Sequence, residues 1–175
     1  SLEHPGVLVQ HGPILRVVFG SRNPSYISPI LSAIQSDLCE SGIDGVLSTH
    51  IQRDALEKFS YVSPIGAAGV YLHAVAGDFQ KEGAARELFK SMIREISTLA
   101  AAMGYPFEKD YVKINLEILS NLSADATTSM QRDIMEGKPS ELDGLVMEPL
   151  RLAKKYSVSM PCYEEVANAL CPLEF

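Results

Sequence analysis

The chain has 175 residues, of which 46% are hydrophobic and 21% are charged, proportions that predict a compact globular protein with a buried core. The formal net charge is −7, and lysine and arginine are scattered along the sequence, so no basic surface is expected that would attract nucleic acid or anionic lipid. The longest apolar run, residues 65–77, is too short to cross a bilayer. Neither nucleic acid nor a membrane is therefore expected as a partner.

Residues 1–51 mix strand and helix patterns. Short runs rich in β-branched residues predict strands at 14–20 and 45–51. Between them, apolar residues at helical spacing predict an amphipathic helix over 24–41 that ends at Gly42. Two strands are too few for an independent sheet, so this α/β segment is expected to belong to a larger one.

From residue 52 onward the apolar pattern changes to a period of 3.6 residues. It predicts an all-helical bundle over 52–175, with helices at 53–62, 64–76, 84–103, 108–122, 127–136, 140–156 and 162–170. Pro149 is expected to kink its helix because it has no N–H and clashes with the preceding turn. The 84–103 helix carries so many large apolar residues that part of its face could bind a second copy of the chain and form a homodimer. The alternative is that the whole face is buried inside one bundle.

Cysteine and histidine are too sparse to indicate a metal site or a disulfide framework. Cys39, Cys162 and Cys171 are odd in number and lack CxxC spacing, which predicts reduced, buried thiols in a cytoplasmic protein. The four histidines show neither HxxxH nor HExxH spacing, so no metal ligands are predicted.

Two predicted helix starts carry polar side chains that could face one substrate. Ser129 stands where a helix cap is expected, and Glu141 lies in the first turn after Pro139. The structural interpretation is a serine cap and a glutamate at the positive end of a helix dipole. The functional interpretation is that the two starts converge, so that N–H groups and a hydroxyl bind a substrate carboxylate while Glu141 accepts from a substrate hydroxyl.

Lys58 is the candidate general acid. It shares a predicted helix face with Val62 and Gly66, four and eight residues later. A lysine among apolar neighbours is suited to donate a proton to a developing alkoxide. The structural alternative is a solvated lysine paired with Asp54.

Three segments together resemble the C-terminal helical domain of ketopantoate reductases (2-dehydropantoate 2-reductases): DALEKFSYVSPIGA, TTSMQRDIMEGKPSELDGLV and LAKKYSVSMP. The resemblance implies a helical bundle of the 6-phosphogluconate dehydrogenase C-terminal type, preceded in residues 1–51 by the tail end of a Rossmann domain. It also implies that Lys58 protonates the keto oxygen as hydride arrives from NADPH, and that Ser129 and Glu141 bind the substrate.

The sequence departs from that family pattern in two ways. Val62 and Gly66 stand where the family has two asparagines, so a wider and more apolar cavity is expected, which suits a different 2-oxo acid or a bulkier carbonyl compound. No GxGxxG occurs in the 175 residues, so no cofactor-binding residues are predicted here. NADPH is expected only with an N-terminal Rossmann domain as partner.

The leading hypothesis is the substrate-binding and dimerising domain of an NADPH-dependent reductase. The first alternative is a non-catalytic helical dimerisation or interaction module with a vestigial pocket. The second is a helical domain of a β-hydroxyacid or 6-phosphogluconate-type dehydrogenase, which would not explain the spacing of Ser129 and Glu141.

Overall fold

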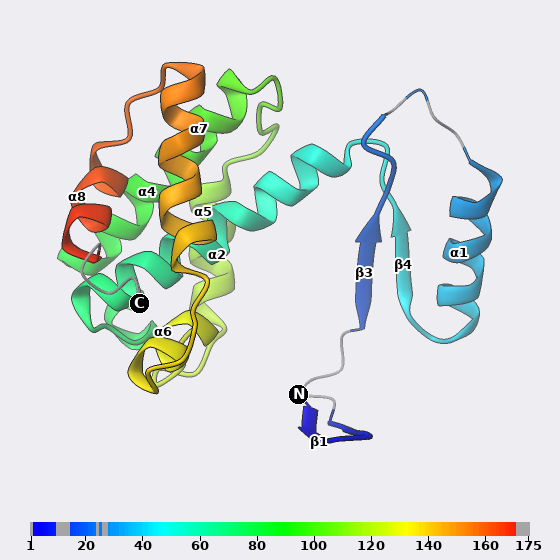
Figure 1. Ribbon diagram of the computed structural model, residues 1–175, viewed down its shortest axis with the longest axis horizontal. Helices are drawn as coiled ribbons and strands as arrows, with labels where there is room; N and C mark the ends of the chain where they lie inside the picture. The colour runs from blue at the N-terminus through cyan, green and yellow to red at the C-terminus, as the bar shows by residue number, and fades with distance from the viewer. Residues whose placement is uncertain (1, 10–14, 24, 26–27, 171–175) are drawn as a thin grey trace. The chain divides into compact units, whose positions relative to one another are not determined.

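The computed structural model describes residues 2–9, 15–23, 25 and 28–170. They form two compact units, 1–54 and 55–175, and the chain is mainly helical, as predicted (Figure 1). The first unit holds β1 (Leu2–His4), β2 (Val7–Leu8), β3 (Arg16–Phe19), α1 (Pro29–Glu40) and β4 (Asp44–Leu47). The later elements are α2 (Ile51–Leu72), α3 (Ala76–Gln80), α4 (Ala84–Ala102), α5 (Tyr111–Ser120), α6 (Ser129–Met135), η1 (Asp143–Met147), α7 (Glu148–Tyr156) and α8 (Pro161–Leu170).

The first unit is built around the predicted strand, helix and strand. Strands β3 and β4 pair in parallel, from Arg16 opposite Asp44 to Phe19 opposite Leu47. Helix α1 joins them and packs on β4, where a Cβ added at Gly45 would lie 2.9 Å from the Cβ of Leu38. The antiparallel pair β1 and β2 was not predicted. The predicted ends at residues 14, 24, 26 and 27 lie outside the described residues.

Helix α2 corrects the prediction of two helices at 53–62 and 64–76. It is one helix that contains Pro64, and it ends at Leu72. Proline has no N–H to give to the carbonyl four residues earlier, which here belongs to Ser60. The buried Asn115 of α5 donates to that carbonyl and to the Ser60 hydroxyl, both at 3.1 Å. A side chain from another helix thus replaces the missing bond, and the helix continues.

Pro149 has a comparable effect further along the chain. The predicted 140–156 helix is a π-helical turn, η1, followed by α7 with Pro149 in its first turn. Pro149 has no N–H to donate to the carbonyl four residues earlier, that of Leu145. Ser63 Oγ donates to this carbonyl instead, at 2.6 Å. Leu142 and Val146 are buried in the core.

Helix α4 forms the centre of the helical unit. Its large apolar residues Phe89, Met92, Ile93, Ile96 and Leu99 are all buried, and α3, α5, α7 and α8 pack on it. None of its large apolar side chains is exposed, so burial within one bundle accounts for the pattern. A homodimer through this helix therefore gains no support and stays a prediction.

The N-terminus of α8 is capped by a side chain of α4. The two carboxylate oxygens of Glu95 accept from the N–H groups of Cys162 and Tyr163, at 2.8 and 3.1 Å. A carboxylate at this position satisfies two donors and favours the positive end of the helix dipole. It ties α8 to α4.

The cysteine prediction was partly wrong. Cys39 is exposed and Cys162 is half-buried, and both are free thiols. Burial raises the pKa of the Cys162 thiol to about 11. Cys171 lies outside the described residues. Within the described part of the chain, no helix is long and apolar enough to cross a membrane.

Replacing Asn115 by alanine tests how α2 tolerates Pro64. The substitution removes the donor to the Ser60 carbonyl and should lower the free energy of unfolding by about 1–3 kcal/mol, measured by urea denaturation. Asn121→Ala, which removes an exposed bond to the Glu117 carbonyl, is the control and should change it by less than about 0.5 kcal/mol. Equal effects would show that the Ser60 carbonyl does not need Asn115.

Candidate functional site

One face of α2 carries the three predicted site residues of that helix. Lys58 is exposed, Val62 is half-buried and Gly66 is buried. At 1.5 Å per residue, Lys58 and Gly66 are about 12 Å apart along the helix axis. Lys58 makes no ion pair with any residue that the structure describes, so the predicted alternative, a pair with Asp54, is absent from that part of the chain.

The start of α6 places Ser129 differently from the prediction. Thr128 is the N-cap and Ser129 is the exposed first residue of the helix. Thr128 Oγ1 accepts from the Gln131 N–H at 3.2 Å, and Gln131 Oε1 accepts from the Thr128 N–H at 3.0 Å, which makes a capping box. Because Thr128 provides the cap, the Ser129 hydroxyl is not used for that purpose. Sequence reasoning chose the wrong one of two adjacent hydroxyl residues.

The start of α6 is anchored to the end of α2. The buried Gln131 side chain donates from Nε2 to the Ala74 carbonyl at 2.8 Å. It lies directly over Gly69, where an added Cβ would come within 2.7 Å of the Gln131 Cδ. Only a residue without a side chain leaves room for Gln131 at this crossing.

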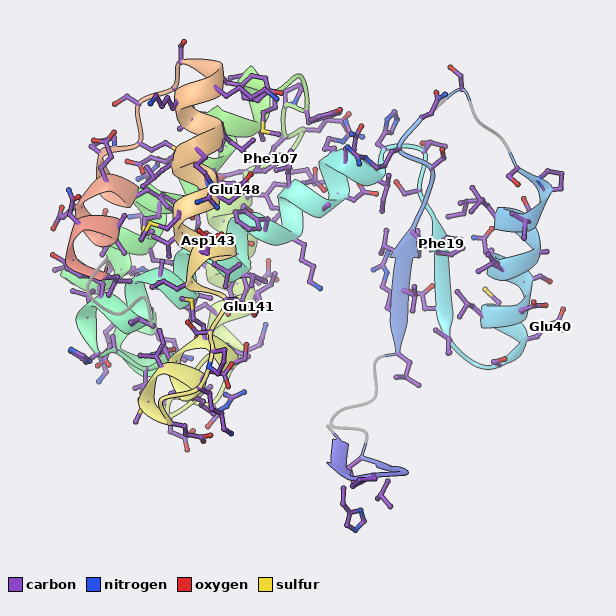
Figure 2. The ribbon with its side chains drawn as sticks, in the orientation of Figure 1. Phe19, Glu40, Phe107, Glu141, Asp143 and Glu148 are labelled. Carbon is purple, nitrogen blue, oxygen red and sulfur yellow. The ribbon has the colours of Figure 1, made fainter. Side chains whose placement is uncertain are left out.

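Glu141 lies two residues before η1, and its side chain is exposed. Its carbonyl accepts from the Leu145 N–H at 2.9 Å, which closes the first turn. Figure 2 shows Glu141 at the lower end of the column formed by η1 and α7, with Asp143 and Glu148 further up it. Arg151 binds both carboxylate oxygens of Asp143 at 2.8 Å, which leaves Glu141 outside this ion-pair group.

The starts of α6 and η1 meet α2 at Gly66. A Cβ added there would lie 3.2 Å from Met130 Cε and 3.9 Å from both Leu145 Cδ1 and Thr128 Oγ1. Thr128 precedes Ser129, and Leu145 is hydrogen-bonded to Glu141. The two predicted helix starts therefore converge on the helix that carries Lys58.

The contacts at Gly66 also correct one expectation. The space that a larger side chain would fill is taken by Met130 and Leu145, so the site is apolar here but not wider. The reason is that two side chains from different elements close over the glycine. From sequence alone neither neighbour could be predicted.

A cavity of about 170 Å³ lies on an adjacent part of the helical unit. Tyr61 and Ile65 of α2, Phe79 of α3, and Thr127 and Gln131 are among its lining residues, but none of the five predicted site residues is. The Tyr61 hydroxyl is buried without a hydrogen-bond partner among the described residues, and burial raises its pKa. Thr128, whose Oγ1 would lie 3.9 Å from a Cβ added at Gly66, also lines this cavity, so the cavity borders the predicted site.

The residues at the two helix starts and on the α2 face supply three kinds of group. Lys58 provides a cation and proton donor, Ser129 a hydroxyl, and Glu141 a carboxylate that can accept from a ligand hydroxyl. Among the described residues, no group of three or more histidine, cysteine, aspartate or glutamate side chains could hold a metal ion. A small polar molecule with a carbonyl or hydroxyl group suits this set.

Comparison with known proteins identifies the family. The family model "Ketopantoate reductase PanE/ApbA C terminal" matches residues 50–174. The chain belongs to this family. The match includes all five predicted site residues, and the resemblance seen in the sequence is confirmed.

Individual relatives are distant in sequence but similar in fold. "Uncharacterized oxidoreductase YkpB" of Bacillus subtilis is 23% identical over 166 residues, which are 95% of this chain and 54% of that protein. The 2-dehydropantoate 2-reductase of Methylococcus capsulatus has a TM-score of 0.82 at 23% identity, covering 94% of this chain and 52% of that one. A D-mandelate dehydrogenase solved with NADH and anilino(oxo)acetate has a TM-score of 0.77 at 17% identity, covering 91% and 66%. The chain spans about half the length of the first two relatives.

Replacing Gly69 by alanine tests the anchoring of α6. The added Cβ would collide with Gln131, so the free energy of unfolding should fall by about 1–3 kcal/mol in urea denaturation. Gly144→Ala is the matched control, because an added Cβ there meets nothing within 4 Å. It should be neutral or slightly stabilising. A neutral Gly69→Ala would mean that Gln131 moves aside freely.

Proposed function

We propose that this chain is the substrate-binding part of an NADPH-dependent reductase that converts a 2-oxo acid, or a related carbonyl compound, to the alcohol. The observation that carries the proposal is the meeting of the α6 and η1 starts at Gly66, on the same α2 face as the exposed Lys58. Side chains of the kinds needed to bind and protonate a carbonyl compound thus belong to two helix starts and to the α2 face on which these starts meet. Membership of the ketopantoate reductase family supports the same activity.

Each polar residue has a distinct role in the proposed reaction. NADPH supplies the hydride to the carbonyl carbon. The Lys58 ammonium group donates a proton to the oxygen, which becomes the hydroxyl group, and takes a proton back in the reverse direction. The Ser129 hydroxyl and the N–H groups at the start of α6 bind the substrate carboxylate. Glu141 accepts a hydrogen bond from a hydroxyl group of the substrate or product.

The residues of this chain do not fit the cofactor by themselves. The β3, α1 and β4 segment lacks the glycine-rich loop that would seat the pyrophosphate of NADPH. We therefore place NADPH on an N-terminal Rossmann domain, of which residues 1–51 would be the tail end. The length of the relatives supports this placement.

The exposure of the first unit's strands also supports a missing partner domain. Val17 and Val18 point to opposite faces of β3, and their exposed fractions are 42% and 41%. Parallel sheets in proteins are usually covered on both faces, so a strand with exposed side chains on both faces suits a position in a larger sheet. A cytoplasmic location is part of the proposal, since Cys39 and Cys162 are free thiols.

The apolar surroundings of Gly66 favour a 2-oxo acid with an apolar side chain. Met130 and Leu145 occupy the place of a polar side chain, and the half-buried Val62 lies one turn away. Apart from the Thr128 hydroxyl, these neighbours offer no hydrogen bond to a substrate hydroxyl group that must lose its water. Ketopantoate, whose reduction would place the chain in pantothenate biosynthesis, carries such a hydroxyl and fits less well. The D-mandelate dehydrogenase solved with anilino(oxo)acetate, which carries an aromatic ring, supports the apolar class.

Lys58→Ala in the intact protein tests the proposed general acid. Loss of the proton donor should lower kcat by about 10²–10⁴ in NADPH-oxidation assays. Lys113→Ala on the exposed surface of α5 is the control and should leave kcat unchanged. A loss smaller than about tenfold for Lys58→Ala would contradict the role.

A substrate panel tests the proposed class. The ratio kcat/KM for phenylglyoxylate and branched aliphatic 2-oxo acids should exceed that for ketopantoate by about tenfold or more. Val62→Asn, which adds an amide to the α2 face, should reduce the ratio of these two kcat/KM values. Absence of NADPH-dependent turnover with every member would contradict the reductase proposal and favour the interaction module.

A further inference from the structure

A buried polar chain connects α8, α2 and η1. Ser63 and Tyr163 are both fully buried, and their oxygens are 2.5 Å apart. Since the Leu145 carbonyl can only accept, Ser63 gives its single proton to that carbonyl, and Tyr163 must donate to Ser63. Burial raises the pKa of Tyr163, so this phenol stays protonated and remains a donor at neutral pH.

The hydrogen bonds from Tyr163 through Ser63 lead to the turn that carries Glu141. The Leu145 carbonyl is held by Ser63, and the Leu145 N–H donates to the Glu141 carbonyl at 2.9 Å. Pro149 cannot supply an N–H to the Leu145 carbonyl, so a side chain from another helix sets the position of this residue. Leu145 itself belongs to η1, which is π-helical, a conformation that is frequent at functional sites.

Ser63 also belongs to the helix that carries the proposed proton donor. It is five residues after Lys58 on α2 and adjacent to Val62. One helix therefore carries both the Lys58 ammonium group and the Ser63 hydroxyl, which bonds the turn that contains Glu141. The bond from Ser63 to Leu145 can fix how far Glu141 lies from Lys58.

We propose that Ser63 is a positioning residue. By bonding the Leu145 carbonyl, it holds Glu141 at the distance from Lys58 that substrate binding requires. This inference rests on the proposed function, because it concerns the same site. Tyr163 orients the Ser63 hydroxyl, but the bond to Leu145 does not depend on it for its proton. Substitutions at Ser63 and Tyr163 should therefore differ in their effects on binding.

A double-mutant cycle in the intact protein tests the proposal. Ser63→Ala should raise KM for the best 2-oxo acid by about fivefold, with a smaller change in kcat. In a Glu141→Ala background the same substitution should change KM by less than about twofold, because the residue it positions is gone. Tyr163→Phe should lower stability while leaving KM within about twofold. Equal KM effects of Ser63→Ala in both backgrounds would overturn the proposal.

Hydrogen exchange separates this inference from the proposed function. Amide exchange in residues 141–147 should accelerate by about tenfold in Ser63→Ala and stay near the wild-type rate in Tyr163→Phe. Ser63→Cys fills the same space with a weak donor and should reproduce the effect if Ser63→Ala does not fold. Unchanged exchange would overturn the link between Ser63 and Glu141. Absence of turnover by the wild type would count against the reductase proposal only.

Discussion

Two buried side chains bond carbonyl groups that prolines leave without their usual donors, and the helical unit depends on them. Pro64 cannot bond the Ser60 carbonyl, and Asn115 of α5 does so instead. Pro149 cannot bond the Leu145 carbonyl, which accepts from Ser63 of α2. A buried carbonyl without a partner is costly, so each interaction fixes one helix against another.

These interactions explain why α2 can serve as the base of the site. Its second half consists largely of small buried residues, which let neighbouring elements come close. Gly69 makes room for Gln131 and so for the start of α6, while Gly66 is covered by Met130 and Leu145. The same features that pack the helices together bring Ser129 and Glu141 towards the face of Lys58.

The polar and apolar parts of the site have separate origins. Lys58, Ser129 and Glu141 are exposed side chains on or next to helices that are held by buried contacts, so their positions depend on residues of the core. The lining at Gly66 comes from side chains of α6 and η1.

By itself the sequence determined the helical class, the strand, helix and strand of the first unit, and the three candidate polar residues, because apolar periodicity and motif spacing are local properties of the chain. Only the tertiary structure decided that α2 passes through Pro64, since the donor to the Ser60 carbonyl, Asn115, is 55 residues away from Ser60. It also decided that Thr128 rather than Ser129 caps α6, through a Gln131 side chain that needs Gly69. The filling of Gly66 by Met130 and Leu145 could not be foreseen, because it depends on how three separate elements pack.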